Sequence, residues 1–360
     1  MKKIEIKTST HPYCIYIGTD LLKRVEKYLE KQYSSIFIIT DNHVASLYLQ
    51  EVKDGLNNNT VHTSVIQSGE ASKSIETYYE LQTKAIEIGL DRQSLIIALG
   101  GGVVGDLAGF VAATYMRGID YVQIPTTILA HDSSVGGKVA INHKLGKNMI
   151  GNFYPPKAVI YDVNTLTTLP IHEVRSGYAE IMKEALIADE NLFKNLLEIE
   201  VKNVSSSQLQ YHLYEAIKVK AEIVEQDERE SSVRKFLNLG HTFAHALEAT
   251  LGYGKLTHGE AVAIGLLFAI KVSEEQLHVQ LPYVPLKHWL RANDYPLTWD
   301  ANIQAMIRLM KSDKKSEKSR IQMVLMKSIG ELMTKELSDD FLINALMEFK
   351  KELGEDDTGI

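Results

Sequence analysis

The sequence predicts an α/β domain followed by an all-α domain. Three observations support this fold class: short apolar runs alternate with helical segments in the first half, a glycine-rich turn follows one of those runs, and helical periodicity dominates the second half. A chain of 360 residues is long enough for two domains at ~100–200 residues each. We expect the α/β domain over residues 1–163, the helical domain over residues 164–353 and a frayed, charged tail over residues 354–360.

The expected strands of the first half are short, and those in the interior of the sheet are continuous apolar runs. Such runs are typical of strands that are buried on both faces of a parallel sheet. We expect strands at Ile4–Lys7, Cys14–Ile17, Ser35–Thr40, Thr60–Ile66, Leu95–Leu99, Tyr121–Pro125 and Ala158–Asp162.

Segments with helical periodicity lie between these strands. We expect helices at Leu21–Lys31, His43–Leu56, Ser74–Gly89 and Val103–Thr114. Because strands and helices alternate, the sheet should be mostly parallel and covered by helices on both faces. From Ile171 onwards helix formers dominate, and the clearest remaining strand is Ile321–Met326.

Composition and charge exclude some functional classes. A hydrophobic fraction of 45% and a charged fraction of 24% are ordinary for a globular protein with a full core. The formal net charge of -7 argues against a broad nucleic-acid-binding surface. An anionic ligand would therefore need a local basic pocket.

Cysteine content and hydropathy favour a cytoplasmic protein. Cys14 is the single cysteine, so no internal disulfide can form, as fits a reducing compartment. The first residues, MKKIEIKTST, lack the apolar core of ~7–15 residues that a secretory signal contains. The longest apolar stretch, Ala261–Ile270, is interrupted by Gly265 and is shorter than the ~18 residues of a membrane span. We therefore expect no membrane association.

The glycine-rich turn has the pattern G-x-G-x-x-G, formed by Gly100, Gly102 and Gly105 between an expected strand and an expected helix. Glycine lets backbone N–H groups approach a pyrophosphate, and a helix N-terminus favours its negative charge. A tight turn without a ligand is the alternative. The acidic residue that should follow ~20 positions later is Asp120, which lies at a turn. Asp41, at the end of an earlier strand, is the better ribose or adenine partner, unless it only caps a helix.

Histidines and a glutamate form a candidate metal site. His241 and His245 are spaced i, i+4 in GHTFAHALEAT and share a helix face, while His258 follows in LTHGEAVAIG. Glu180 lies in an otherwise apolar helical segment, SGYAEIMKEALI. A Glu/His/His set with an open position suits catalytic zinc, and a set without thiolate also admits cobalt or manganese. Ordinary hydrogen-bonded histidines are the alternative, and the spacing alone does not decide which two histidines bind metal.

Basic side chains gather near the same segments. Lys138 and Lys147 lie in a glycine-rich stretch that reads as a ligand-holding loop, DSSVGGKVAINHKLGKNMIGNF. Lys183 follows Glu180 by three residues, on the same helix face, and Lys220 precedes the histidine segment. Solvated surface lysines are the alternative.

Arg234, Asn238, His241 and His245 occur at steps of 4, 3 and 4 and would line one helical face. A guanidinium and an amide beside a metal site suit a carboxylate or a phosphate. The alternative is a charged helix face in solvent.

Five segments together resemble the 3-dehydroquinate synthase family of sugar phosphate cyclases. They are GGGVVGDLAGFVAATYMRGIDYVQIPTTILAHDSSVGGKVAIN, KNMIGNFYPP, SGYAEIMKEALI, RKFLNLGHTFAHALE and LTHGEAVAIG. The similarity is strong over residues 65–270 and looser elsewhere. The resemblance implies a Rossmann-like N-terminal domain and a helical C-terminal domain, with NAD and the substrate in the cleft between them.

The resemblance also implies roles for individual residues. It assigns one divalent metal, zinc or cobalt, to Glu180, His241 and His258, and it makes His245 a substrate contact. The implied NAD contacts are Asp41, Ser68, Gly69, Glu70, Ala71, Ser72, Lys73, Gly102, Val103, Val104, Gly105, Asp106, Thr126, Thr127, Lys138, Lys147, Thr165, Leu166, Thr167 and Thr168. The implied substrate contacts are Asp132, Lys138, Asn148, Lys183, Lys220, Arg234, Asn238 and His245. The family is typically dimeric, and Arg117 resembles the arginine that reaches a neighbour's site.

The sequence departs from the family pattern at a few positions. Ala244 stands where glycine is usual between the two histidines, which is a small change that helix propensity favours. His43 stands where asparagine is common near the adenine ribose. One active-site lysine should come from the segment Lys311–Lys318, and the sequence does not decide between Lys314 and Lys315.

The implied activity is that of a carbon–oxygen lyase of the shikimate pathway to aromatic amino acids. It converts the phosphorylated sugar acid 3-deoxy-D-arabino-heptulosonate 7-phosphate to 3-dehydroquinate and phosphate, by transient oxidation with NAD, elimination, reduction and intramolecular aldol closure. The alternatives are another sugar phosphate cyclase, such as a 2-deoxy-scyllo-inosose or valiolone-type synthase, a polyol dehydrogenase of the related metal-dependent group, and an inactive binding protein. Lys220 and Arg234 favour a carboxylated substrate.

Overall fold

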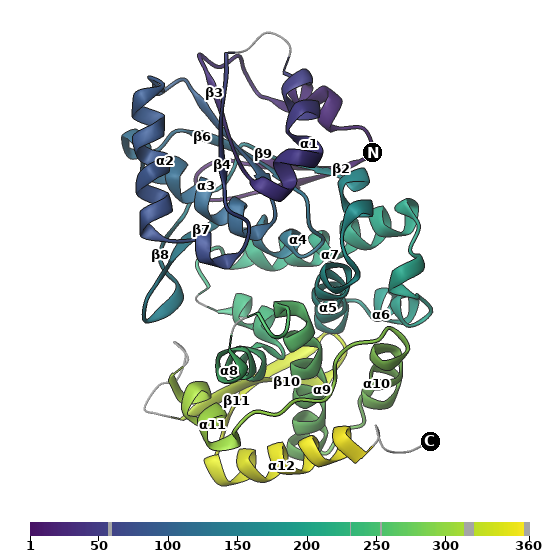
Figure 1. Cartoon of the computed structure of the whole chain (residues 1–360). Helices are drawn as coiled ribbons and strands as arrows, with labels where there is room; N and C mark the ends of the chain where they lie inside the picture. The colour runs from purple at the N-terminus through teal and green to yellow at the C-terminus, as the bar shows by residue number, and fades with distance from the viewer. Residues whose placement is uncertain (57–59, 231, 253, 313–319, 356–360) are drawn as a thin grey trace. The chain divides into compact units, whose positions relative to one another are not determined.

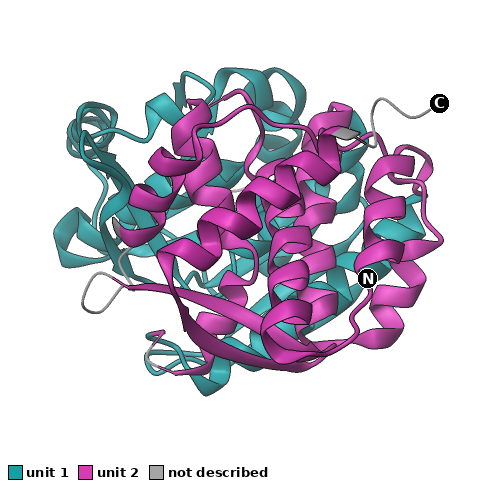
Figure 2. Ribbon diagram, turned by 90° about the horizontal axis from the view of Figure 1, so that it is seen from below, with its two compact units in different colours: residues 1–169, 205–229 teal, residues 170–204, 230–360 magenta. Residues whose placement is uncertain are grey.

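A computed structural model describes residues 1–56, 60–230, 232–252, 254–312 and 320–355 of the chain. The chain forms two compact units, which Figure 2 distinguishes by colour. Unit 1 consists of Met1–Leu169 and Ser205–Arg229, and unit 2 consists of Pro170–Val204 and Glu230–Ile360. This division differs from the single predicted boundary after residue 163, because a later segment returns to the first unit.

Unit 1 is built on a seven-stranded sheet, which confirms the predicted α/β class (Figure 1). Its strand order is β1 (Lys2–Ile6), β2 (Tyr13–Gly18), β9 (Ala158–Asp162), β6 (Asp120–Pro125), β5 (Leu95–Gly100), β3 (Ile36–Asp41) and β4 (Val61–Ile66). The edge strand β1 is antiparallel to β2, and every other neighbouring pair is parallel. All the predicted strands of the first half correspond to strands of this sheet.

Over the described residues of unit 1, the remaining elements are helical apart from one hairpin. They are η1 (Leu22–Tyr28), α1 (Asn42–Asp54), η2 (Glu70–Ser72), α2 (Ile75–Glu87), α3 (Gly102–Thr114), η3 (Tyr115–Arg117), α4 (Ala130–Ser133), η4 (Val163–Thr168) and α7 (Ser206–Gln226). The predicted helix Leu21–Lys31 is instead the shorter 3₁₀ segment η1, with a kink at Arg24. Helix α7 contacts β1, β2, α4 and η4, and these contacts place it in unit 1 although unit 2 begins before it in the sequence.

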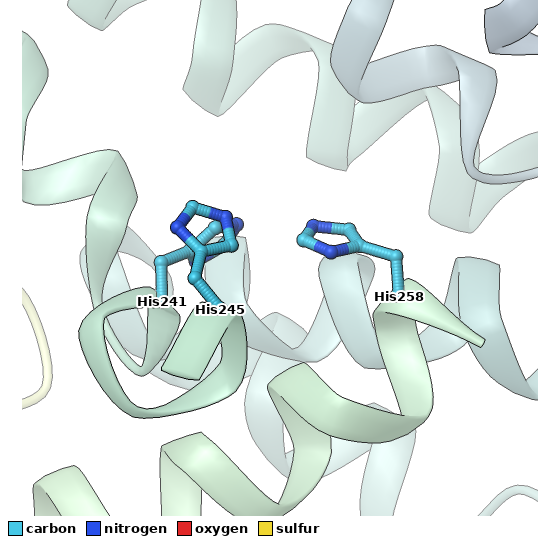
Figure 3. A group of neighbouring side chains, drawn as sticks. All are labelled: His241, His245 and His258. Atoms are coloured by element: carbon cyan, nitrogen blue, oxygen red, sulfur yellow. The ribbon is translucent and has the colours of Figure 1, made fainter. Parts of the chain in front are cut away.

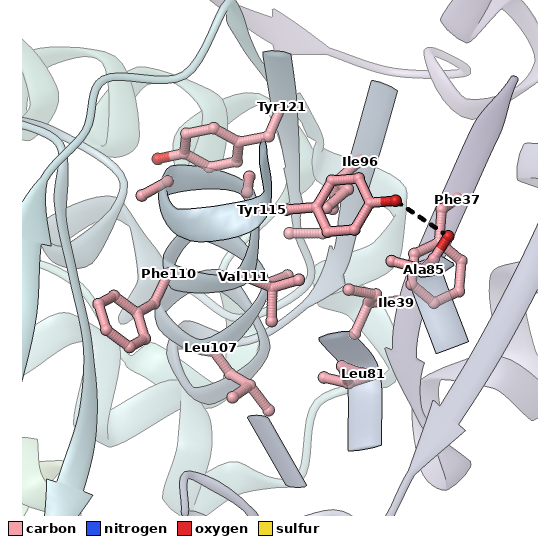
Figure 4. Packing of buried hydrophobic residues seen from close by; sticks show 14 of the residues in the cluster. Phe37, Ile39, Leu81, Ala85, Ile96, Leu107, Phe110, Val111, Tyr115 and Tyr121 are labelled. Carbon is pink, nitrogen blue, oxygen red and sulfur yellow. Dashed lines mark hydrogen bonds between the residues drawn. The ribbon is translucent and has the colours of Figure 1, made fainter. Parts of the chain in front are cut away.

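Buried side chains cover both faces of the sheet because neighbouring residues of each strand point in opposite directions. Phe37 and Ile39 of β3 pack in one cluster with residues of α2 and α3, which Figure 4 shows. Ile36 and Ile38 pack in the other cluster, with residues of η1 and α1. In the first cluster the Tyr115 hydroxyl donates to the carbonyl oxygen of Ala85 at 3.3 Å. Each fully buried aliphatic side chain contributes about 1.5–3 kcal/mol relative to an exposed one.

The glycine-rich stretch that was expected to be a loop is a β-hairpin. Its strands β7 (Lys138–His143) and β8 (Gly146–Phe153) pair antiparallel, apart from the main sheet. The hairpin forms because Val139 and Ile141 alternate inward and pack into the cluster against α3. Gly109 of α3 permits this contact, since a Cβ atom there would lie 2.4 Å from Cγ1 of Val139.

Unit 2 is mainly helical but also contains a hairpin. Its elements are α5 (Ile171–Ala188), α6 (Glu190–Leu197), η5 (Val201–Asn203), η6 (Val233–Asn238), α8 (His241–Leu251), α9 (His258–Leu277), α10 (Tyr283–Ala292), α11 (Ile303–Ser312), β10 (Ile321–Ser328), β11 (Glu331–Leu337) and α12 (Asp339–Glu355). The predicted helical C-terminal domain is confirmed, and so is the predicted strand Ile321–Met326, which is part of β10 and pairs with β11.

Helix α12 continues to Glu355, so the tail predicted to fray from residue 354 begins inside a helix, and residues 356–360 lie outside the described part of the chain. Over the residues that the structure describes, none of the helices combines the length and the apolar character needed to cross a membrane.

Candidate active site

The predicted nucleotide contacts of unit 1 follow the carboxyl ends of neighbouring strands. Asp41 ends β3, the segment Ser68–Lys73 follows β4, and Gly102 opens the helix after β5. Thr126 and Thr127 follow β6, and η4 follows β9. These five strands are adjacent in the parallel sheet, so the structure gathers the predicted residues at one edge. The carboxyl edge of an open parallel sheet is where ligands bind in this kind of fold.

Asp41 caps the following helix. Its Oδ1 atom accepts hydrogen bonds from the backbone N–H groups of His43 and Val44, both at 2.9 Å. An aspartate in this position stabilises a helix by about 1 kcal/mol. The capping role that the sequence left open is therefore present, and it uses one of the two carboxylate oxygens.

Lys73 and Asp106 were both predicted to contact NAD, and the structure pairs them with each other. Lys73 Nζ lies 2.5 Å from Asp106 Oδ2, and Lys73 is 4% exposed. Burial raises the pKa of Asp106, and the charge and hydrogen bond of Lys73 oppose that rise. The pair fastens the segment Ser68–Lys73 to the helix that the glycine turn opens.

The hairpin β7–β8 carries three of the predicted ligand contacts. Lys138 lies at the open end of the hairpin, whereas Lys147 and Asn148 lie beside its turn. Asn148 has a φ of 56°, and its backbone N–H donates to Oδ1 of Asn142 at 2.9 Å. The structure therefore places Lys147 and Asn148 next to each other and Lys138 apart from them.

Two predicted substrate contacts of unit 1 form an ion pair. Lys220 of α7 lies with its Nζ atom 2.8 Å from Asp132 Oδ1 of α4, and it also donates to the Asp132 carbonyl oxygen. Lys220 is 5% exposed, whereas the Asp132 side chain is 30% exposed, so water still reaches the carboxylate. This contact explains how a helix from later in the chain contributes to the residues at the end of the sheet.

Arg117 lies in an unusual backbone turn. Met116 and Arg117 have φ values of 48° and 70°, and Gly118 follows with a φ of 118°. Side chains other than glycine occupy the left-handed region at a cost of about 1–2 kcal/mol each. Arg117 is exposed at this turn.

Glu180 forms the centre of the candidate metal site in unit 2. It comes from α5 and is 0% exposed. Its Oε1 atom lies 3.3 Å from the Nε2 atom of His241 and 3.3 Å from that of His258. Its Oε2 atom lies 2.6 Å from Lys183 Nζ. The structure thus brings together the three residues that the resemblance assigned to a metal.

The other ring nitrogens of the two histidines determine which atoms face Glu180. His241 Nδ1 donates to the carbonyl oxygen of Leu239 at 3.1 Å, and His258 Nδ1 donates to Glu248 Oε2 at 2.9 Å. In a neutral imidazole the remaining Nε2 atom then carries a lone pair. Two nitrogen lone pairs and a buried carboxylate oxygen that accepts no well-aligned hydrogen bond point at one another, and this arrangement fits a cation between them.

His245 lies beside this set. Figure 3 shows the rings of His241 and His245 on α8 turned toward the ring of His258, and the ligand atoms of the three lie within 4.8 Å of one another. Burial, together with the neighbouring His241 and His258, lowers the pKa of His245 to about 3. Burial lowers the pKa of His258, but without a cation the contacts with Glu180 and Glu248 outweigh it and raise that pKa to about 10. A metal that binds here would therefore displace the Nε2 proton of His258.

Two glycines let α9 approach the helices that carry the other members of the site. A Cβ atom at Gly259 would lie 1.9 Å from the backbone oxygen of Ser176 in α5. A Cβ atom at Gly265 would lie 2.2 Å from the backbone oxygen of Gly240, just before α8. Backbone contacts at both points therefore determine how far His258 lies from Glu180 and from His241.

The single helical face predicted from Arg234 to His245 is wrong. Helix η6 ends at Asn238, Gly240 has a φ of 79°, and α8 begins at His241. The left-handed turn at Gly240 interrupts the helix, so Arg234 and Asn238 do not share a helix with the histidines. Asn238 instead donates from Nδ2 to Oε1 of Glu230 at 3.2 Å.

The sequence did not identify two side chains that organise these residues. Glu248 orients His258, and its position seven residues after His241 in the same helix could have indicated it. Asn142 binds the backbone of Asn148, and no sequence signal marks it because the surrounding glycines favour a loop over a strand. Lys314 and Lys315 lie outside the described residues.

Two family models match the chain over consecutive ranges. The 3-dehydroquinate synthase N-terminal model matches residues 63–176, and the 3-dehydroquinate synthase C-terminal model matches residues 177–316. The chain is 54% identical over 357 residues to the 3-dehydroquinate synthase of Oceanobacillus iheyensis, covering 98% of this chain and 99% of the relative. It is 49% identical over 358 residues to that of Halalkalibacterium halodurans, with the same coverage.

Solved structures with this fold include a 2-deoxy-scyllo-inosose synthase complexed with carbaglucose-6-phosphate, NAD+ and Co2+. It is 26% identical with a TM-score of 0.89, covering 96% of this chain and 100% of that one. A 2-epi-5-epi-valiolone synthase from Streptomyces hygroscopicus subsp. jinggangensis with NAD+ and Zn2+ bound is 25% identical with a TM-score of 0.86, covering 96% and 98%. A glycerol dehydrogenase from Schizosaccharomyces pombe, 16% identical with a TM-score of 0.66 over 95% and 89% of the two chains, shares the fold alone.

The fold thus places the chain in the structural class of the sugar phosphate cyclases. Within that class, the chain belongs to the 3-dehydroquinate synthase family. The resemblance drawn from the five sequence segments is confirmed.

Proposed function

We propose that this chain is an enzyme that converts 3-deoxy-D-arabino-heptulosonate 7-phosphate to 3-dehydroquinate and phosphate. The observation that carries the proposal is the buried Glu180 oxygen that faces two imidazole Nε2 atoms, in a chain that is 54% identical to a 3-dehydroquinate synthase. A buried carboxylate that faces two imidazole Nε2 atoms is a donor set that suits a divalent cation. It is costly to keep in a protein that has no chemical use for it.

Glu180, His241 and His258 hold one divalent metal in this proposal, either zinc or cobalt. Nitrogen and oxygen donors without thiolate suit both ions. When bound, such an ion supplies Lewis acidity to substrate hydroxyl and carbonyl groups. The carbonyl oxygen of Leu239 and the carboxylate of Glu248 fix the orientation of the two rings.

The residues at the carboxyl edge of the sheet bind NAD, which when bound accepts and returns a hydride. The N-terminus of α3, from Gly102 to Val104, faces the pyrophosphate with its backbone N–H groups. Asp41 binds a ribose or the adenine while it caps α1. Lys73 and Asp106 hold the neighbouring turn against α3.

Charged side chains bind and orient the substrate. Lys220 and Arg234 bind the carboxylate, and Lys138, Asn148 and His245 bind the phosphate, with further contacts from Asp132, Lys183 and Asn238. Lys183 and Lys220 already have carboxylate neighbours in Glu180 and Asp132, which hold them in place as cations. Such charge-assisted contacts orient the ring atoms and favour one cyclisation geometry.

The enzyme acts as a homodimer in this proposal, with Arg117 reaching the neighbour's site. The left-handed backbone turn at Arg117 is the supporting observation, because strained backbone persists at functional positions when the surroundings hold it. Sedimentation analysis of wild type tests the dimer, and a monomeric wild type contradicts the proposal. A substrate titration of Arg117→Ala tests the reach of the arginine, and a variant that stays dimeric but binds substrate more weakly is expected.

The decisive experiment measures phosphate release from the heptulosonate phosphate. Chelator-treated protein is supplied with NAD and with zinc or cobalt, while NADH absorbance is followed in the same cuvette. Phosphate release without net NADH accumulation is expected, because the hydride is returned within each turnover. Chelator-treated protein without added metal serves as the control.

The other outcomes identify the alternatives. Steady NADH formation without phosphate release from this substrate would make the chain a dehydrogenase. Metal and NAD binding without either signal would indicate a different sugar phosphate as substrate. The absence of metal and NAD binding would contradict the proposal altogether.

A further inference from the structure

Asn142 connects three parts of unit 1 that the proposed function uses separately. It lies in β7 and makes three hydrogen bonds with three different groups. Its backbone N–H donates to the carbonyl oxygen of Lys73 at 2.8 Å, and its Nδ2 donates to Glu70 Oε1 at 2.8 Å. Its Oδ1 accepts from the backbone N–H of Asn148 at 2.9 Å.

Two of these bonds reach the predicted nucleotide segment. Glu70 and Lys73 lie in the turn that follows β4, and Lys73 is paired with Asp106 of α3. The chain of contacts therefore runs from the helix after the glycine turn, through the Lys73 pair, to the side chain and backbone of Asn142. Lys73 and Asp106 are both mostly buried, so this part of the chain of contacts has little freedom to move.

The third bond reaches the turn of the hairpin. Asn148 is exposed and has a left-handed backbone, a conformation that asparagine tolerates better than most residues. Its N–H group is directed at Asn142 Oδ1 across the hairpin. Because this bond holds the backbone of Asn148, it also determines where the side chains of Asn148 and its neighbour Lys147 can reach.

We infer that Asn142 is a positioning residue that links the NAD-binding turn to the hairpin end that carries Lys147 and Asn148. This inference rests on the proposed function for what the two segments bind. The side chain touches neither ligand in this proposal. It fixes the relative placement of two segments within unit 1, so that NAD bound at one segment meets an already ordered hairpin at the other.

The chemistry of the site explains why an amide is needed. Glu70 offers an acceptor and Asn148 offers a donor, so the residue between them must donate with one terminal atom and accept with the other. Aspartate would keep the acceptor for Asn148 but would place a second carboxylate beside Glu70. Leucine has a similar size and can form neither bond.

These differences give a test with two variants that fail in different ways. Asn142→Asp keeps the bond to Asn148 and opposes Glu70, so the Kd for NAD should rise about tenfold while the KM for the heptulosonate phosphate stays within about twofold. Asn142→Leu loses both bonds, so the Kd for NAD and the KM should each rise about fivefold or more. Both should be measured on the full-length, metal-loaded protein.

Hydrogen exchange gives an independent measurement without substrate. Peptides that cover residues 144–150 should exchange faster in Asn142→Leu than in wild type, and at the wild-type rate in Asn142→Asp. Asn152→Ala is the matched control, because Asn152 lies in the same hairpin and its side chain accepts only from the adjacent Phe153 N–H among the contacts that the structure describes. This control should behave as wild type in all three measurements.

The outcomes separate this inference from the proposed function. If wild type binds NAD and releases phosphate but both Asn142 variants match it, the positioning role is wrong and the activity stands. If both variants raise the Kd and the KM equally and lower the melting temperature together, Asn142 serves the fold alone. If wild type itself neither binds NAD nor releases phosphate, the proposed function fails first.

Discussion

Helix packing holds the functional residues of unit 2 in place, whereas hydrogen bonds hold those at the end of the hairpin in unit 1. Around Glu180 the metal-site side chains come from three helices, and the helices meet through backbone contacts at Gly259 and Gly265. In the hairpin of unit 1, Asn148 and most of β8 are exposed, and the three hydrogen bonds of Asn142 hold the end of the hairpin.

Each of these hydrogen bonds contributes about 1–3 kcal/mol, the bond to the Glu70 carboxylate the most, whereas a close backbone contact cannot yield without moving a helix. The comparison teaches that close helix packing fixes the metal site, whereas hydrogen bonds that a single substitution can remove fix the end of the hairpin. Substitutions of the metal ligands should therefore have large effects on metal binding and turnover. Substitutions of residues that only support the ligands should have smaller effects.

The largest effect is expected from His258→Ala. The substitution removes one of the two imidazoles that face Glu180, so stoichiometric metal and turnover should both be lost. Metal analysis after dialysis, together with the phosphate assay, measures this. An active variant that retains one metal per chain would remove His258 from the ligand set.

A smaller effect is expected from Glu248→Gln, which keeps the shape of the side chain but weakens its hold on His258 Nδ1. Loss of such an orienting carboxylate typically lowers metal affinity by about 10–100-fold. Competition with a chromophoric chelator measures the change in the metal Kd. Glu275→Gln, an exposed position farther along α9, is the control and should leave the Kd unchanged. Equal Kd values for the two variants would mean that the packing of α9 alone orients the ring.

The glycine contacts can be tested by a pair of identical substitutions. Gly265→Ala should lower the free energy of unfolding by about 1–3 kcal/mol, because its Cβ would lie 2.2 Å from the Gly240 carbonyl oxygen. Gly354→Ala, in α12, meets no atom within 4 Å and should raise that free energy by up to about 1 kcal/mol through helix propensity. Urea unfolding of both variants measures the contrast. Equal shifts would show that α9 can move away from α8 at little cost.

The smallest effect is expected at Glu352, a carboxylate at the surface of unit 2. It contacts Lys271 of α9 at 2.6 Å, and Lys287 and the Tyr283 hydroxyl at 2.8 Å each. Although burial acts in the opposite direction, these hydrogen bonds lower the pKa of Glu352 to about 2.

Because the folded-state pKa lies below the ordinary value of about 4.5, the contribution of Glu352 is fully present above that pH and disappears as the pH falls toward 2. Solvent screening limits it to under about 1 kcal/mol. Urea unfolding of Glu352→Gln should therefore differ from wild type at pH 7 and converge with it in acid. Its metal Kd should be that of wild type, in contrast to Glu248→Gln, and a weakened metal site would mean that surface charges also hold α9.

The sheet of unit 1 could be predicted because its strands are continuous apolar runs. Two of these strands, Ile36–Asp41 and Leu95–Gly100, are buried along almost their whole length. Their burial can be inferred directly because nearly all of their residues are apolar. The hairpin β7–β8 could not be predicted in the same way. Glycines surround it, and only Val139 and Ile141 reveal that one of its faces packs on α3.

The residues of the metal site could be predicted from the sequence, but the contacts that position them could not. The histidine spacing and the family resemblance named Glu180, His241 and His258, but the turn at Gly240 depends on a backbone φ of 79° that no residue pattern specifies. The pairing of Glu248 with His258 joins two helices, and the bonds of Asn142 join a strand to a distant turn. Contacts of this kind depend on the assembled fold and leave no periodic signal in the sequence.

Helix α7 has a consequence for the synthesis of the protein. It packs on β1 and β2, yet Pro170–Val204 of unit 2 must leave the ribosome before it does. At about 5–20 residues per second, the ribosome needs several seconds to add the residues between the end of the first segment of unit 1 and the end of α7. During that interval the nascent sheet lacks the helix that contacts β1 and β2 in the folded unit. The first unit therefore cannot finish folding before translation of the second has begun.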